Sequence, residues 1–181
     1  VTVDEVFESL REALPTGRAV LFDRDGTLCE YAEYLNKWQN LKVMDDIEHT
    51  NRLIHKDFSL IGITNQSGIA RGIVEEDFVR KVNTLFKEKH GFKAFYYCPH
   101  HPDEHCPCRK PEPGMLLRAR AEHGVDLKSS YVVGDREADV QAARAVGARA
   151  VLVKSPRVAG PSGADFEARS LAEAVAWILE N

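Results

Sequence analysis

The stretch Ala19-Val20-Leu21-Phe22-Asp23-Arg24-Asp25-Gly26-Thr27 changes from apolar to polar at a single point. Four apolar residues in a row predict a short buried strand, and the following Asp-Gly predicts a turn at its end. Two carboxylates spaced this way are also suited to catalysis, because one can attack an electrophile while the other transfers a proton. Taken alone, the Asp-Gly pair is more typical of an ordinary turn than of a catalytic site.

The alternation of strand, polar turn and helix continues along the chain. Further strands are predicted at 58–63, 94–97, 131–133 and 150–153, and helices at 3–14, 44–56, 75–89, 113–123, 136–146 and 167–179, with a loop rich in Pro, Gly and Ser at 155–164. Strands that alternate with helices predict a parallel, doubly wound α/β sheet. In such sheets functional residues gather at the carboxyl ends of the strands.

Composition and charge narrow the class of protein. The chain has 181 residues, with 24 Lys and Arg against 28 Asp and Glu, for a formal net charge of −4. This length suits one domain over residues 1–181, and the mild negative charge argues against a general nucleic-acid-binding protein. No apolar stretch approaches the roughly 20 residues of a membrane span, and the charged N-terminal region is unlike a signal peptide. We therefore expect a cytoplasmic monomer that binds neither nucleic acid nor membrane.

The second predicted strand ends in a polar turn, Thr64-Asn65-Gln66-Ser67-Gly68, and Arg71 follows it. A hydroxyl, an amide and main-chain N–H groups are the donors that hold phosphate oxygens. By itself this turn is a weak signal, because polar residues after a strand are usually plain loop.

Two further clusters precede helices. Arg109-Lys110 offers a bidentate fork and a point charge, although an isolated basic pair is more often surface charge. Gly134-Asp135-Arg136 follows the fourth strand, where Asp135 is placed to share Mg²⁺ with Asp23. Helix capping is the alternative role for Asp135.

In combination these clusters resemble the four motifs of the haloacid dehalogenase (HAD) superfamily, in the same order along residues 18–154. The motifs are Asp23-Arg24-Asp25-Gly26-Thr27, Thr64, Lys110, and Gly134-Asp135 with Asp139. A narrower resemblance, in residues 65–72, 96–102 and 108–116, is to the D-glycero-D-manno-heptose 1,7-bisphosphate 7-phosphatases, of which the histidinol-phosphate phosphatases are close relatives. The resemblance implies a Rossmann-like HAD fold, with a parallel sheet flanked by helices.

The resemblance also implies a reaction, which is Mg²⁺-dependent hydrolysis of the 7-phosphate of a heptose bisphosphate through an aspartyl-phosphate. Asp23 is the implied nucleophile, Asp25 the acid and then the base, and Thr64 and Lys110 hold the phosphoryl group. The Asp23 carboxylate, the Asp25 main-chain carbonyl and Asp135 are the implied Mg²⁺ ligands. The residues expected to bind the substrate are Arg24, Tyr31, Tyr34, Asn65, Gln66, Ser67, Arg71, Arg109 and Arg136. Histidinol phosphate, or another small phosphate monoester, is the alternative substrate.

A second metal is expected in the loop 98–108, which reads Cys98-x-His100-x5-Cys106-x-Cys108. Clustered cysteines in a chain without an export signal are typical of metal sites rather than disulfides. Three thiolates and one imidazole form a closed set, typical of structural zinc. His101 and His105 are alternatives to His100, and Cys29 lies outside the loop.

Substrate selectivity is expected to come from two small covers, residues 28–43 and the zinc loop 98–108. Roughly 40–45 residues separate Asp23 from Thr64 and Thr64 from Lys110, which suffices for a helix and a strand but leaves no room for a cap domain. Tyr31 and Glu33 depart from the Asp and Gly usual in heptose phosphatases, and the short metal loop is similar to that of the histidinol-phosphate enzymes. Residues 67–72 instead favour the heptose enzymes.

Overall fold

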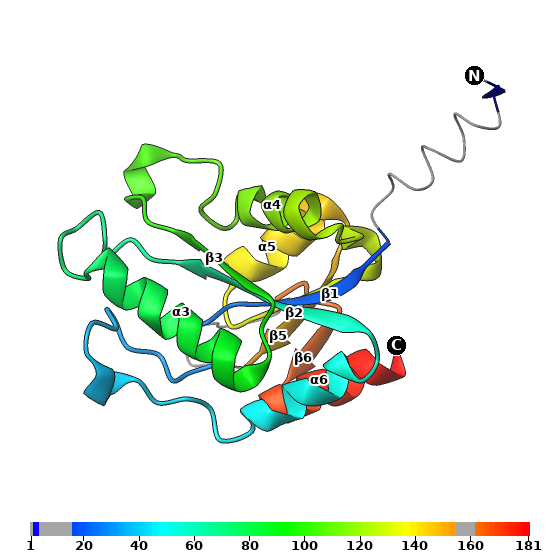
Figure 1. Ribbon diagram of the computed structural model, residues 1–181, viewed down its shortest axis with the longest axis horizontal. Helices are drawn as coiled ribbons and strands as arrows, with labels where there is room; N and C mark the ends of the chain where they lie inside the picture. Colours follow the sequence, from blue (N-terminus) through cyan, green and yellow to red (C-terminus); the bar gives the residue numbers. More distant parts are fainter. Residues whose placement is uncertain (1, 4–15, 155–161) are drawn as a thin grey trace.

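The computed structural model describes residues 2–3, 16–154 and 162–181, so the helix predicted at 3–14 and most of the loop predicted at 155–164 lie outside the described residues. Its six strands form one sheet in the order β3-β2-β1-β4-β5-β6, and every neighbouring pair is parallel (Figure 1). The strands are β1 Arg18–Phe22, β2 Phe58–Asn65, β3 Ala94–Cys98, β4 Tyr131–Gly134, β5 Arg149–Val153 and β6 Phe166–Ala168. The predicted parallel α/β sheet is confirmed.

Helices cover both faces of the sheet (Figure 1). The α-helices are α2 Asn51–Ile54, α3 Glu76–His90, α4 Gly114–His123, α5 Glu137–Val146 and α6 Leu171–Glu180, and the 3-10 helices are η1 Trp38–Asn40, η2 Ile47–Thr50, η3 Pro102–Glu104 and η4 Leu127–Ser129. Apolar residues of α2, α3 and α6 share one buried cluster, and those of α4 and α5 share another. No helix in the described part of the chain is long and apolar enough to cross a membrane.

The central strand β1 shows why the apolar runs form this sheet. Val20 and Phe22 belong to the cluster under α3 and α6, whereas Ala19 and Leu21 belong to the cluster under α4 and α5. All four side chains are fully buried. A strand buried on both faces needs a continuous apolar run rather than an alternating one, which is the pattern of residues 19–22.

Two predicted helices differ from the structure. In place of a helix over 44–56 there are only η2 and α2, because the stretch contains poor helix formers such as Asp, Thr and Asn. The helix predicted from 167 begins at Leu171, where the Ser170 side chain accepts a hydrogen bond from the Glu173 N–H and caps the helix. Residues 166–168 instead form β6, which pairs with β5.

The strand order creates a crevice at the carboxyl end of the sheet. The helices that follow β1 and β2 cover one face, whereas those that follow β3 and β4 cover the other, so the chain diverges between the neighbouring strands β1 and β4. Ligands in open α/β sheets bind at this switch point. The segment 23–57 that follows β1 contains only the short helices η1, η2 and α2, so no cap domain is inserted there.

Candidate active site

A cavity of about 280 Å³ lies at the carboxyl ends of the strands, and most of the sequence-predicted site residues line it. The predicted residues that line it are Asp23, Asp25, Tyr31, Tyr34, Thr64, Asn65, Gln66, Ser67, Arg71, Arg109, Lys110 and Arg136. Further lining residues that we did not assign to the site are Ala32, Glu33, Leu35, Gly68, Pro102, Ala138 and Asp139. The two predicted covers therefore both contribute, through residues 31–35 and through Pro102.

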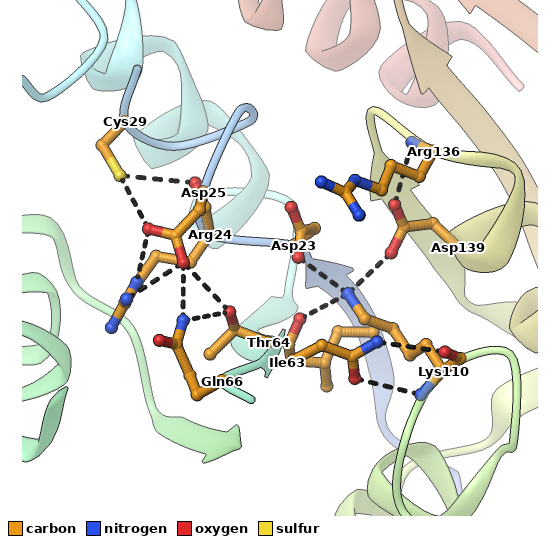
Figure 2. A network of polar contacts seen from close by, with 11 residues as sticks. Asp23, Arg24, Asp25, Cys29, Ile63, Thr64, Gln66, Lys110, Arg136 and Asp139 are labelled. Atoms are coloured by element: carbon orange, nitrogen blue, oxygen red, sulfur yellow. Dashed lines mark hydrogen bonds and ion pairs between the residues drawn. The ribbon is translucent and has the colours of Figure 1, made fainter. Parts of the chain in front are cut away.

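Lys110 is the centre of the contacts on one side of the cavity (Figure 2). Its ammonium nitrogen Nζ donates to Asp23 Oδ1 at 2.8 Å, to Asp139 Oδ1 at 2.6 Å and to the Ile63 carbonyl at 2.8 Å. Its main chain is held as well, because Asn65 Oδ1 accepts from the Lys110 N–H and Asn65 Nδ2 donates to the Lys110 carbonyl, both at 3.0 Å. The side chain and the main chain of Lys110 thus both form hydrogen bonds with the carboxyl end of β2.

The charges of this group stabilise one another. Burial raises the pKa of Asp23 to about 6, against the lowering effect of Lys110 and with a further rise from Asp139. Burial alone would lower the pKa of Lys110, but Asp139 and Asp23 raise it above its ordinary value. Lys110 therefore stays a cation beside Asp23, where an incoming phosphate needs positive charge.

Asp139 is a site residue whose role the motifs left open. One carboxylate oxygen accepts from Lys110, and the other accepts from the Arg136 N–H at 3.1 Å (Figure 2). A Cβ atom at Gly134 would lie 2.2 Å from this carboxylate. Gly134 is thus required at the end of β4, because any side chain there would displace Asp139 from Lys110.

Asp25 lies on the other side of the cavity and accepts from several donors (Figure 2). Arg24 donates from Nε to Oδ1 at 3.1 Å and from Nη2 to Oδ2 at 3.0 Å. Gln66 Nε2 donates to Oδ2 at 2.6 Å, and Thr64 Oγ1 donates to the same oxygen at 3.4 Å. Cys29 Sγ lies 3.5 Å from Oδ1. Burial would raise the pKa of Asp25, but the Arg24 guanidinium and these hydrogen bonds hold it below its ordinary value.

The prediction that Arg24 binds the substrate is wrong. Its side chain is 0% exposed, and its guanidinium contacts Asp25 and, from Nη1, Asn83 Oδ1 at 2.9 Å. The chain bends at Arg24, and its side chain turns away from the cavity toward Asn83 of α3. Asn83 was not predicted as a functional residue. The sequence signal that could have found it is a polar residue on the same helix face as the apolar Val79, Val82 and Phe86.

The donor set for a divalent cation is present beside Asp23. Carboxylate oxygens of Asp23, Asp135 and Asp139 lie within 4.8 Å of one another, and Asp135 is 0% exposed. Lys110 and the Arg136 N–H already occupy the oxygens of Asp139. Asp23 and Asp135 are therefore the pair that fits Mg²⁺, which usually binds one or two carboxylates and completes its shell with water and substrate oxygens.

A second cluster of metal-ligand type lies in the loop 98–108. Cys98 Sγ lies 3.4 Å from Cys106 Sγ and 3.5 Å from His100 Nδ1, and Cys108 Sγ lies 3.2 Å from His100 Nδ1 and 3.6 Å from Cys106 Sγ. These separations are near the roughly 3.5–3.8 Å between ligands of tetrahedral zinc. Of the three candidate histidines, the structure brings His100 to the cluster, whereas His101 Nδ1 accepts from the Asp103 N–H.

Part of the chain matches a family model, and curated proteins match most of it. Residues 107–174 match the HAD-hydrolase-like family model. The D-glycero-beta-D-manno-heptose-1,7-bisphosphate 7-phosphatase of Yersinia pestis is 39% identical, over 86% of this chain and 92% of the relative. The enzyme of the same name from Escherichia coli K12 is 38% identical, over 86% of this chain and 90% of the relative.

A solved structure agrees. The D,D-heptose 1,7-bisphosphate phosphatase of B. bronchiseptica, crystallised with magnesium and phosphate, superposes with a TM-score of 0.80 at 26% identity, over 90% of this chain and 98% of the other. The extent of these matches, and their agreement with the fold, identify the chain as a phosphatase that hydrolyses phosphate esters. It belongs to the D-glycero-beta-D-manno-heptose-1,7-bisphosphate 7-phosphatase family of HAD-like hydrolases.

Proposed function

We propose that this phosphatase removes the 7-phosphate of D-glycero-D-manno-heptose 1,7-bisphosphate. The observation that carries the proposal is the distribution of positive charge in the cavity. Lys110 lies buried beside Asp23 at its base, and Arg71, Arg109 and Arg136 line it as well. Lys110 and a metal beside Asp23 serve the reacting phosphate. The three arginines are then left for a second anionic group.

In the first step the Asp23 carboxylate attacks phosphorus and the bond from phosphorus to the sugar oxygen breaks, which leaves an aspartyl-phosphate. The departing oxygen takes a proton from Asp25. Thr64 and Lys110 hold the phosphoryl oxygens, and Lys110 supplies fixed positive charge where negative charge develops.

In the second step Asp25 takes a proton from a water molecule. The water oxygen attacks phosphorus, the bond to Asp23 breaks, and inorganic phosphate is released. The contacts that lower the pKa of Asp25 favour its ionised form, which is the form that a general base needs.

Mg²⁺ is the metal we assign to Asp23 and Asp135, with the Asp25 main-chain carbonyl as a further ligand. When bound, it offsets the repulsion between the Asp23 carboxylate and a phosphate dianion. We assign Zn²⁺ to Cys98, His100, Cys106 and Cys108, in a structural role, because four protein ligands leave no open position for catalysis.

Histidinol phosphate is the second candidate substrate, and Glu33 favours it. Glu33 lines the cavity among the basic residues. A carboxylate in this wall suits an amino group better than a second phosphate, and histidinol phosphate carries one phosphate and an amine.

A phosphate-release assay with Mg²⁺ decides between the candidates. The panel comprises both anomers of the heptose 1,7-bisphosphate, histidinol phosphate, sugar monophosphates and a phosphorylated oligonucleotide. We expect the highest kcat/KM for a heptose bisphosphate anomer. The proposal fails if histidinol phosphate or a monophosphate has the higher kcat/KM, and Glu33→Gln should then depress histidinol phosphate hydrolysis selectively.

A further inference from the structure

We propose that Arg24 and Asn83 form a positioning pair that holds the proton-transferring carboxylate of Asp25 in its working orientation. The inference rests on the role proposed above for Asp25. Neither residue lines the cavity, so neither contacts the substrate, and both act through Asp25.

The contact between Arg24 and Asp25 fixes the plane of the carboxylate. Two guanidinium nitrogens, Nε and Nη2, each donate to a different oxygen of Asp25, at 3.1 and 3.0 Å. Such a bidentate contact constrains orientation as well as distance. Arg24 cannot move aside easily, because its side chain is among the largest that are fully buried in this protein.

Asn83 connects this contact to the long helix α3. Its Oδ1 accepts from Arg24 Nη1 at 2.9 Å, so the third donor nitrogen of the guanidinium is fixed to a rigid element. Asn83 is 4% exposed, and among the described residues its Nδ2 has no hydrogen-bond partner. A buried donor without a partner costs free energy. An apolar residue would avoid that cost, and the contact with Arg24 accounts for an asparagine at this position.

A fixed carboxylate matters because proton transfer depends strongly on geometry. Gln66 and Thr64 also donate to Asp25 and line the cavity, whereas Arg24 approaches from the protein interior. Without Arg24 the carboxylate can rotate, and a misplacement of about 1 Å can cost on the order of 100-fold in rate. The loss of rate is expected in the step in which the departing alcohol needs a proton.

Substrates with different leaving groups distinguish a loss of Asp25 positioning from a general loss of activity. An alkyl alcohol is a poor leaving group and needs a proton from Asp25, whereas p-nitrophenol leaves as a stable anion without one. We therefore compare kcat/KM for a primary alkyl phosphate and for p-nitrophenyl phosphate in the Mg²⁺-loaded enzyme. The variants are Arg24→Met and Asn83→Leu, with Thr84→Ala, an exposed neighbour on α3, as the matched control. Asp25→Asn gives the full effect of losing the acid.

Arg24→Met should lower kcat/KM for the alkyl phosphate on the order of 10-fold more than for p-nitrophenyl phosphate. Asn83→Leu should show the same preference to a smaller extent, and Thr84→Ala should show none. An equal loss on both substrates, or a smaller loss on the alkyl phosphate, overturns the proposal. If Arg24→Met does not fold, Asn83→Leu alone decides, because it replaces the side chain with one of similar volume and leaves the ion pair intact.

The outcome is separable from that of the proposed function. The alkyl substrate is whichever primary alkyl phosphate the unmodified enzyme hydrolyses best, so failure to act on heptose bisphosphate leaves the comparison valid. If Asp25→Asn itself lowers both activities equally, the role proposed for Asp25 is wrong and the positioning proposal falls with it.

Discussion

At the scale of single residues, Lys110 connects stability to activity. Three acceptors surround its ammonium group, and only 2% of its side chain is exposed. Two of these acceptors are the carboxylates of Asp23 and Asp139. Removing the cation leaves two buried carboxylates without their partner, and such a loss is costly.

Lys110→Met should therefore lower the free energy of unfolding by about 3 kcal/mol. It should also lower kcat on the order of 10²–10³-fold, because a fixed positive charge at the phosphoryl group is lost. Denaturant unfolding and phosphate release measure the two effects. The matched control is Lys81→Met on the surface of α3, whose side chain is 64% exposed. A folded Lys110→Met with activity like that of Lys81→Met would contradict this role.

The residue scale also shows what the sequence can and cannot predict. The positions of Asp23, Thr64 and Lys110 were predictable, because they follow recognisable strands or precede a helix, and all three line the cavity. The orientation of Arg24 was not, because a motif fixes the order of residues but not the face on which an intervening side chain is buried. Its partner Asn83 lies 59 positions away, and contacts of that kind come from helix packing.

At the scale of elements, the loop 98–108 buries few side chains besides those of its metal-type cluster. Cys98, at the end of β3, is fully buried, but most of the loop between His100 and His105 is half-buried or exposed. The loop ends directly before Arg109 and Lys110, so its order affects the phosphate-binding residues. Structural zinc contributes folding free energy in small segments of this kind.

Metal analysis of the protein purified without added zinc should find about one zinc ion per chain. Cys106→Ser should lose it, and with it most of the Mg²⁺-dependent activity. Cys29→Ser changes the one cysteine outside the cluster and should keep the zinc. Zinc-free protein that retains full activity would refute the structural role assigned to this metal.

The junction of β4 and α5 provides a test of local packing. Gly134→Ala would place a methyl group against the Asp139 carboxylate and should disturb Lys110, with a loss of stability of about 1–3 kcal/mol and a loss of activity. Gly124→Ala is the control. It strains a left-handed residue at φ +61 but meets no atom within 4 Å, so it should lower stability and leave kcat unchanged. Equal kcat for the two variants would contradict the link to Lys110.

Elements with strong local signals were predicted to within one or two residues. Examples are α3, with acidic residues in its first turn and Gly91 as its left-handed C-cap, and α5, whose C-cap is Gly147. An element with a weak local signal is β6, which was not predicted, has only three residues and depends on pairing with β5. Its alternation of partly buried Phe166, exposed Glu167 and buried Ala168 is too short to distinguish from the start of a helix.

At the scale of the whole molecule, the chain has a net charge of −4, but acidic and basic side chains line its cavity in equal number. Four carboxylate side chains and four cationic side chains line it: Asp23, Asp25, Glu33 and Asp139, and Arg71, Arg109, Lys110 and Arg136. A phosphate entering this cavity meets no net positive charge from the protein itself. A divalent cation at Asp23 and Asp135 would make the cavity positive.

Binding of inorganic phosphate should therefore depend on Mg²⁺. Isothermal titration calorimetry should show affinity at least about tenfold higher with Mg²⁺ than with a chelator. The matched control is Asp135→Asn, which should reduce this difference. Equal affinity with and without Mg²⁺ would show that the protein's own cations suffice.

Asp23 is expected to remove one particular phosphate, that on C7, from a sugar bisphosphate. ³¹P NMR of the heptose 1,7-bisphosphate, incubated with enzyme and Mg²⁺, follows both phosphates at once. We predict loss of the C7 phosphate signal, growth of inorganic phosphate in equal amount and retention of the C1 phosphate, with no turnover by Asp23→Asn. Loss of the C1 phosphate, an unchanged spectrum, or turnover by Asp23→Asn near that of the unmodified enzyme would contradict the claim.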